Sequence, residues 1–149
     1  MQSQALQDEF NPAFFIVYTR SPFALAEGYS RRTNMDIRQS ARRVKFMFEY
    51  QYDNYTSLAS RLHVRYEDIV AQPEGVMHKV QAFLPDFVPP IVHREQVFDA
   101  HNHLGKGMPL TDFNQRSLER LTMEQVEIVR QELSTISEKL KIFGYSLEV

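Results

Sequence analysis

A short apolar run that passes directly into a helix start constrains this chain more than any other feature. Phe14 to Thr19 (FFIVYT) is almost entirely apolar, β-branched or aromatic, which is typical of a strand covered on both faces. Ser21 then offers an N-cap oxygen, and Pro22 has the fixed φ angle of a first helical residue. The sequence therefore predicts a strand followed at once by a helix that ends near Arg32.

The next part of the chain repeats this alternation of strands and helices. We expect a helix from Ile37 to about Tyr55 capped by Asp36, a strand from Leu62 to Tyr66, and a helix that begins at Pro73. Strands that are separated by helices pair in parallel. The predicted fold class is therefore α/β, with a short parallel sheet and mostly helical content.

The last third of the chain divides into an irregular and a helical part. Prolines make the stretch from Pro85 to about Thr111 irregular, and so long a connection is usually functional or mobile. Thr122 and Gln125 match a capping box, and Gly144 is a natural helix stop. Two strands make a poor sheet by themselves, so we expect further strands from an upstream segment or a partner chain.

Composition narrows the class of protein. The 149 residues suit a single domain, 1–149, and 43% hydrophobic residues exclude a wholly disordered chain. A net charge of −2 gives no reason to expect nucleic acid or an anionic membrane as partner. No apolar run reaches the roughly 20 residues of a membrane span, and no signal peptide is evident. We therefore expect a cytoplasmic protein.

Metal and thiol chemistry have little support in the sequence. The absence of cysteine excludes disulfides, zinc–thiolate sites and a cysteine nucleophile. His101 and His103 have no carboxylate cluster near them beyond Asp99, so no metal is expected there.

A basic segment begins at the end of the first predicted helix and continues into the second. It can be a solvated helical face or a field that attracts an anionic ligand, and the sequence leaves both open. Its members are Arg31, Arg32, Arg38, Arg42 and Arg43.

The junction between the first strand and its helix is the best candidate for a ligand site. Arg20 lies at the carboxyl end of the strand, where open α/β sheets bind ligands. A guanidinium beside a helix N-terminus is a good receptor for a phosphate dianion. Alternatively, Arg20 pairs with a nearby carboxylate. Tyr66, at the end of the second strand, offers a stacking surface or a hydrogen bond.

Three segments together resemble the sulfotransferases that use 3′-phosphoadenosine 5′-phosphosulfate (PAPS). Phe14 to Arg32 resembles their strand-arginine-x-proline-helix segment, and Leu62 to Leu84 their strand-Tyr-Glu-Asp-x₄-Pro-helix segment. Phe113 to Tyr145 resembles their C-terminal helices, which end in Phe-Gly-Tyr. The resemblance implies part of a P-loop-like, three-layer α/β/α fold.

The resemblance also implies roles for residues of the first segment. Arg20 matches the arginine that binds the 3′-phosphate of the cofactor. Gly28 stands where many members have a serine whose hydroxyl contacts the same phosphate. A glycine can instead bring its backbone close to the phosphate, or allow a helix to pack closely on the sheet, and the sequence leaves both open.

Later segments contribute the remaining candidates. Tyr66 matches a tyrosine that meets the adenine ring, whereas Glu67 and Asp68 are expected to anchor a helix N-terminus. Lys106, between Gly105 and Gly107, matches a basic loop that closes over the 3′-phosphate, unless it is a plain surface turn.

The family's N-terminal phosphosulfate-binding loop has no counterpart here, because Met1 to Ala13 contain no glycine and no strand-loop-helix pattern. The expectation is a domain incomplete at its N-terminus, either a fragment or one completed by a partner chain. The expected function is sulfuryl transfer from PAPS to a hydroxyl or amine acceptor, with this chain carrying the part that binds 3′-phosphoadenosine. The alternative is a non-catalytic interaction or nucleotide-binding module, with a second copy of the chain as one candidate partner. No catalytic residue is assigned.

Overall fold

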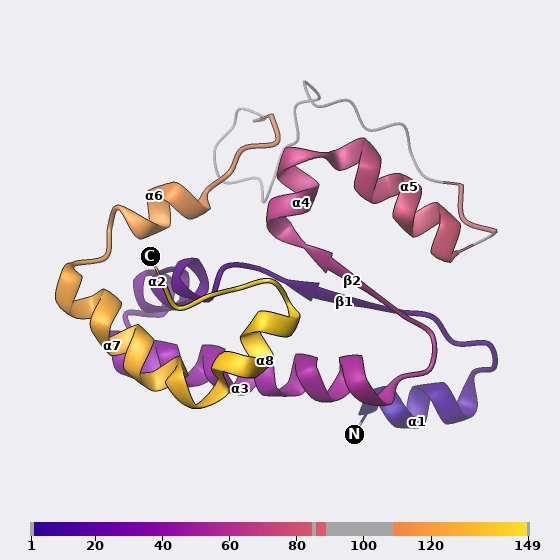
Figure 1. The fold of residues 1–149 in the computed structure, drawn as a ribbon, viewed down its shortest axis with the longest axis horizontal. Helices are drawn as coiled ribbons and strands as arrows, with labels where there is room; N and C mark the ends of the chain where they lie inside the picture. The colour runs from indigo at the N-terminus through magenta and orange to yellow at the C-terminus, as the bar shows by residue number, and fades with distance from the viewer. Residues whose placement is uncertain (1, 85, 89–108, 149) are drawn as a thin grey trace.

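A computed structural model describes residues 2–84, 86–88 and 109–148 (Figure 1). The elements, in chain order, are α1 Gln2–Glu9, β1 Phe15–Thr19, α2 Pro22–Thr33, α3 Ile37–Ser57, β2 Arg61–Arg65, α4 Tyr66–Ala71, α5 Pro73–Phe83, α6 Asn114–Leu118, α7 Met123–Leu133, the 3-10 helix η1 Ser134–Ile136, and α8 Ser137–Ile142.

The two strands pair in parallel, as the sequence predicts. The register runs from Phe15 opposite Arg61 to Thr19 opposite Arg65. Within the described residues this is a two-stranded sheet in the order β1-β2, and most of the remaining structure is helical. The α/β class with a short parallel sheet is confirmed at this coarse level.

Helix starts follow the predicted capping residues. Ser21 precedes α2, and its Oγ accepts a hydrogen bond from the backbone N–H of Ala24. Asp36 precedes α3, where its Oδ1 accepts from the N–H of Arg38 at 2.8 Å. Thr122 and Gln125 form the predicted capping box of α7. Each cap provides acceptors for N–H groups that have no partner inside the helix.

Two helices were not expected from the sequence. α4 has six residues, too few to show a periodic pattern, so the sequence did not indicate it. Tyr66 begins this helix, whereas we expected it to end the strand before it. α1 is polar and lacks a clear apolar stripe; a hydrogen bond from the N–H of Ala59 to Gln7 Oε1, 2.7 Å long, connects it to the segment before β2.

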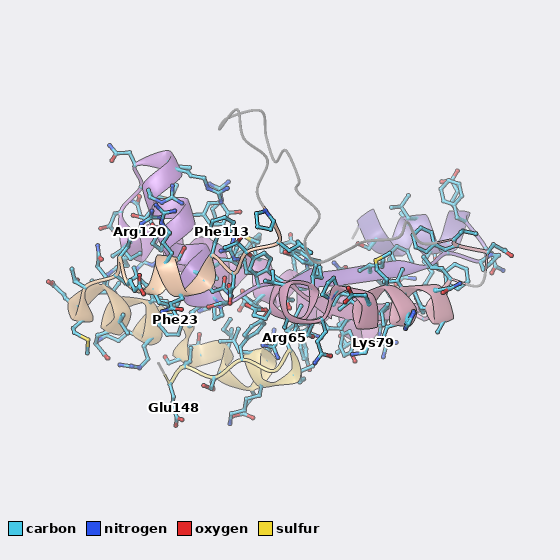
Figure 2. The ribbon with its side chains drawn as sticks, turned by 90° about the horizontal axis from the view of Figure 1, so that it is seen from above. Phe23, Arg65, Lys79, Phe113, Arg120 and Glu148 are labelled. Atoms are coloured by element: carbon cyan, nitrogen blue, oxygen red, sulfur yellow. The ribbon has the colours of Figure 1, made fainter. Side chains whose placement is uncertain are left out.

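The core has a main and a minor cluster. In the main cluster, Val17 of β1 packs with residues of α2, α3, α7 and α8, and α3 and α8 lie along one side of the strands (Figure 1). In the minor cluster, Val64 of β2 packs against Val76 and Val80 of α5. α5 lies on the other side of the strands from α3 and α8 (Figure 1), and Figure 2 shows Lys79 of α5 away from Phe23 of α2, with Arg65 between them.

Part of the sheet stays open to solvent. Ile16 and Tyr18 alternate with the buried Val17 and Thr19, and their side chains are 48% and 45% exposed. β1 therefore buries one face, and the prediction that it is covered on both faces is wrong. Among the described helices, none combines the length and apolar character that spanning a membrane requires.

Candidate functional site

Arg20 and Tyr66 lie side by side because of the strand register. Thr19 is opposite Arg65 in the parallel pair, so the residue after each strand leaves the sheet at the same carboxyl edge. The guanidinium carbon of Arg20 lies 4.4 Å from the centre of the Tyr66 ring, a cation–π contact. Both residues are half-buried.

Arg20 has a neutral partner. Its Nε donates to Oδ1 of Asn114, the first residue of α6, at 2.7 Å. Within the described ranges, Arg20 forms no ion pair and its two terminal amino groups have no hydrogen-bond partner. The alternative of a carboxylate pair for Arg20 is therefore not observed there.

Glu67 anchors the start of α2, as expected. Its Oε1 accepts from the N–H of Ser21 at 2.8 Å and from Nδ2 of Asn114 at 2.6 Å. The N–H of Ser21 at the start of α2 thus donates to the Glu67 carboxylate, whereas the predicted site would use such an N–H group to bind an anion. The positive charge available to an anion comes chiefly from the Arg20 guanidinium. Asp68 lies in the first turn of α4, but within the described residues its carboxylate accepts no hydrogen bond from the N–H groups of a helix start.

A directed chain of hydrogen bonds reaches Glu67 from β1 and β2. Tyr145 donates to Glu67 Oε2 at 2.8 Å, because a carboxylate can only accept and burial raises the tyrosine pKa. Tyr145 OH then accepts from Thr19 Oγ1 at 3.2 Å, and Thr19 accepts from His63 Nε2 at 2.8 Å. His63 is therefore the Nε2–H tautomer, and burial, with the nearby Arg65, lowers its pKa.

The hydroxyl of Tyr66 holds the segment before α6. It donates to the carbonyl of Thr111 at 2.8 Å and accepts from the N–H of Phe113 at 3.2 Å. One ring face carries Arg20, so an adenine ring would have to use the remaining surface.

Gly28 lies within α2 and is buried. A Cβ added there would meet only Nη2 of Arg32, at an ordinary 3.7 Å. Close packing of α2 on the sheet is therefore not the reason for this glycine. The nearby Ser30 hydroxyl donates to the carbonyl of Met35 at 2.7 Å.

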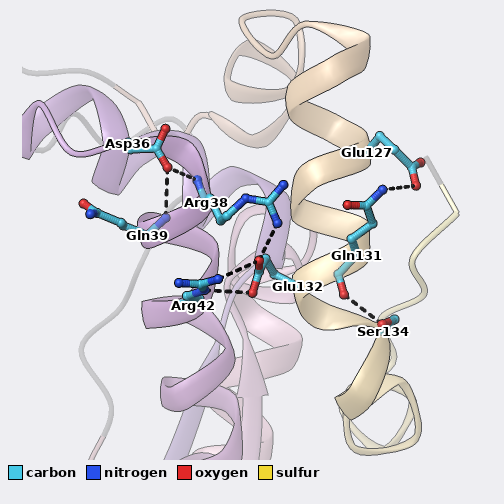
Figure 3. A network of polar contacts seen from close by, with 8 residues as sticks. All are labelled: Asp36, Arg38, Gln39, Arg42, Glu127, Gln131, Glu132 and Ser134. Atoms are coloured by element: carbon cyan, nitrogen blue, oxygen red, sulfur yellow. Dashed lines mark hydrogen bonds and ion pairs between the residues drawn. The ribbon is translucent and has the colours of Figure 1, made fainter.

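The basic segment lies in the last turn of α2 and the first part of α3, and three of its five arginines form ion pairs within the protein. Arg38 and Arg42 of α3 pair with Glu132 of α7 at 2.6 and 3.0 Å (Figure 3). Arg31 pairs with Glu27 at 2.8 Å. Arg38 and Arg42 thus connect α3 to α7, and Arg31 pairs within α2. These internal ion pairs disfavour a shared field for an anionic ligand.

Other candidates give less information. Lys106, His101 and His103 lie outside the described residues. Within those residues, no group of three or more His, Asp or Glu side chains could hold a metal ion. A cavity of about 60 Å³ beside Arg20, lined also by Leu25 and Met47, has room for a few water molecules. This cavity is too small to hold a nucleotide.

Sequence analysis did not identify Asn114 or Tyr145 as site residues. Both lie within the C-terminal segment that resembles sulfotransferases, but neither belongs to a motif with an assigned role. No family model matches the chain, and neither the curated proteins nor the solved structures include a significant match to it.

Proposed function

We propose that this chain binds the 3′-phosphoadenosine part of PAPS and serves sulfuryl transfer to a hydroxyl or amine acceptor. The observation that carries the proposal is the Arg20 guanidinium, which lies at the carboxyl edge of two parallel strands without an ion-pair partner among the described residues. A planar guanidinium with two unengaged amino groups matches two oxygens of a phosphate. The resemblance of three segments to sulfotransferases identifies this phosphate with the 3′-phosphate.

In this proposal, the exposed surface of Tyr66 contacts the adenine ring, and Gly28 and Lys106 lie near the same phosphate. The sheet would be part of a P-loop-like, three-layer arrangement. The catalytic residues and the acceptor stay unassigned. PAPS is the sulfuryl donor, and the chemistry calls for no metal.

Calorimetry with 3′-phosphoadenosine 5′-phosphate tests the proposal. Arg20→Ala removes a charge-assisted contact that is worth on the order of 2 kcal/mol, so the affinity should fall about 30-fold. Arg20→Lys keeps the charge but not the planar pair of donors, so its affinity should be intermediate.

Two controls make the result specific. Arg43→Ala removes an exposed arginine from α3 and should leave the affinity unchanged. Adenosine 5′-monophosphate lacks the 3′-phosphate, so Arg20→Ala should affect its binding far less. Absence of nucleotide binding by the unmodified protein would refute the proposal.

A second candidate function, a non-catalytic interaction module, is favoured by the open face of β1. Ile16 and Tyr18 expose apolar surface that α5 leaves uncovered. Exposed apolar surface of this kind favours association with another chain, including a second copy of this one.

A further inference from the structure

The side chain of Asn114 separates a positive from a negative charge. Its Oδ1 accepts from Arg20 Nε at 2.7 Å, and its Nδ2 donates to Glu67 Oε1 at 2.6 Å. An amide can accept from a cation and donate to a carboxylate at the same time, which an ionised carboxylate cannot do. Asn114 is only 7% exposed, so the environment favours this one arrangement over exchange with water.

Hydrogen-bond donors other than Arg20 stabilise the Glu67 carboxylate. The N–H of Ser21 and the hydroxyl of Tyr145 donate to its two oxygens, each at 2.8 Å, and Arg65 Nε lies 3.7 Å from Oε2. The carboxylate is therefore compensated without Arg20. This leaves the bridging amide as the contact between Glu67 and the arginine.

Asn114 also orients Arg20. Because Nε is engaged by Asn114 and one face of the guanidinium lies on Tyr66, the edge formed by the two terminal amino groups is left for a ligand. That edge presents two parallel N–H donors, the arrangement that binds tetrahedral oxyanions.

We propose that Asn114 keeps Arg20 available to an anion, as a neutral bridge that prevents Arg20 from closing an ion pair with Glu67. The identity of the ligand as a 3′-phosphoadenosine nucleotide rests on the proposed function. The bridge itself implies binding of a simple tetrahedral dianion such as sulfate.

An aspartate at position 114 would convert this bridge into a pH-sensitive one. Its carboxylate would stand against Glu67, and two carboxylates this close share a proton at low pH. At high pH both are ionised, and the added charge neutralises Arg20. Three charged groups contact Asn114 directly: Arg20, Glu67 and Asp112. Further charged or titratable groups lie one or more contacts away: Arg65, Tyr66, Tyr145 and His63, the last through Thr19.

The test is an NMR titration with sulfate that follows the Arg20 Nε–H signal. Sulfate does not titrate between pH 5.5 and 8, so it introduces no pH dependence of its own. Asn114→Asp should bind sulfate at least about tenfold more weakly than the unmodified protein at pH 8. At pH 5.5 this difference in sulfate affinity should be smaller. Each variant is compared with the unmodified protein at the same pH, so any effect of His63 is present in both and does not contribute to the difference.

Two further variants separate the bridge from the added charge and from folding. Asn114→Ala frees Arg20 to approach Glu67, and should weaken sulfate binding by a similar factor at both pH values. Asn54→Asp adds the same charge within α3, away from the site's contacts, and should behave as the unmodified protein. Thermal unfolding of each variant checks that it is folded.

The outcomes also separate this inference from the proposed function. Sulfate binding with the expected pH dependence supports the bridge, even if 3′-phosphoadenosine 5′-phosphate does not bind, in which case the proposed function alone fails. Sulfate affinities in Asn114→Ala and Asn114→Asp equal to that of the unmodified protein overturn the inference. So does failure of the unmodified protein to bind sulfate.

Discussion

Gly28 and Gly144 show how two glycines in one chain serve different purposes. Gly144 has a φ of +75°, and a Cβ there would lie 3.1 Å from Nη1 of Arg65. Its backbone thus needs the left-handed conformation that glycine adopts without strain. Gly28 is helical and has free space beside it, so its conformation does not explain why it is glycine.

Replacing each glycine by alanine should therefore change stability in opposite directions. Gly28→Ala should raise the free energy of unfolding by up to about 1 kcal/mol, because alanine favours the helix. Gly144→Ala should lower it by about 1 kcal/mol or more through backbone strain. Thermal unfolding measures both, and a lower melting temperature for Gly28→Ala would mean that an unseen constraint acts on this position.

At the scale of elements, ion pairs connect helices that are distant in sequence. Glu132 of α7 receives Arg38 and Arg42 from α3, and its side chain is only 15% exposed (Figure 3). The hydrogen bonds from Arg42 and Arg38 hold the pKa of the Glu132 carboxyl below its usual value. A depressed folded-state pKa gives stability that is present above the unfolded-state pKa and is lost as the pH falls through the folded-state pKa.

Glu132→Gln should accordingly destabilise the protein near neutral pH and have little effect in acid. Because both arginines are partly exposed, we expect a loss of about 1 kcal/mol or less at pH 7. The difference between variant and unmodified protein should begin to shrink as the pH falls below the usual carboxyl pKa of about 4.5, and it should vanish once the pH is below the lowered pKa of the folded state. Thermal unfolding across this range measures the effect.

Glu138→Gln serves as the matched control. Glu138 lies on α8, is 81% exposed and pairs with Lys141 three residues later, so its replacement should have a smaller effect. An equal loss in both variants, or a Glu132→Gln effect that persists in acid, would contradict the role given to the contact between α3 and α7.

At the scale of the whole molecule, the helices cover the sheet unevenly. The main core packs on the face of β1 that contains Val17, and α5 packs on β2 through Val64. Ile16 and Tyr18 are left about half exposed. The physical reason is that α5 covers this face over Val64 of β2, whereas no described helix covers the same face over Ile16 and Tyr18 of β1.

This open surface should make the protein self-associate. Sedimentation at increasing concentration should show a rising average mass, and Ile16→Lys should suppress it by placing a charge in the apolar contact. Met123→Lys is the control, since Met123 is 84% exposed at the start of α7. A single monomeric species at every concentration would count against the interaction module.

Local patterns were enough to predict much of the fold. The apolar run before Thr19, the capping residues Ser21, Asp36 and Thr122, and the stop at Gly144 each act on neighbours in sequence, so their effect can be read directly. Parallel pairing followed from the helices between the strands. The sequence predicted Arg20 directly after the first strand and Tyr66 as the last residue of the second. In the structure Tyr66 begins α4 directly after β2, and the register brings the two residues together.

Only the tertiary structure decided what surrounds Arg20. Its partner Asn114 is 94 residues away, and Tyr145 reaches Glu67 across 78 residues. Contacts of this kind depend on how α6 and the C-terminal segment pack against the strand ends, and they leave no periodic signal in the sequence. Likewise, Arg38 and Arg42 form ion pairs because α7 packs against α3 and brings Glu132 close to them. The sequence shows that both residues are charged, but not which carboxylate lies within reach.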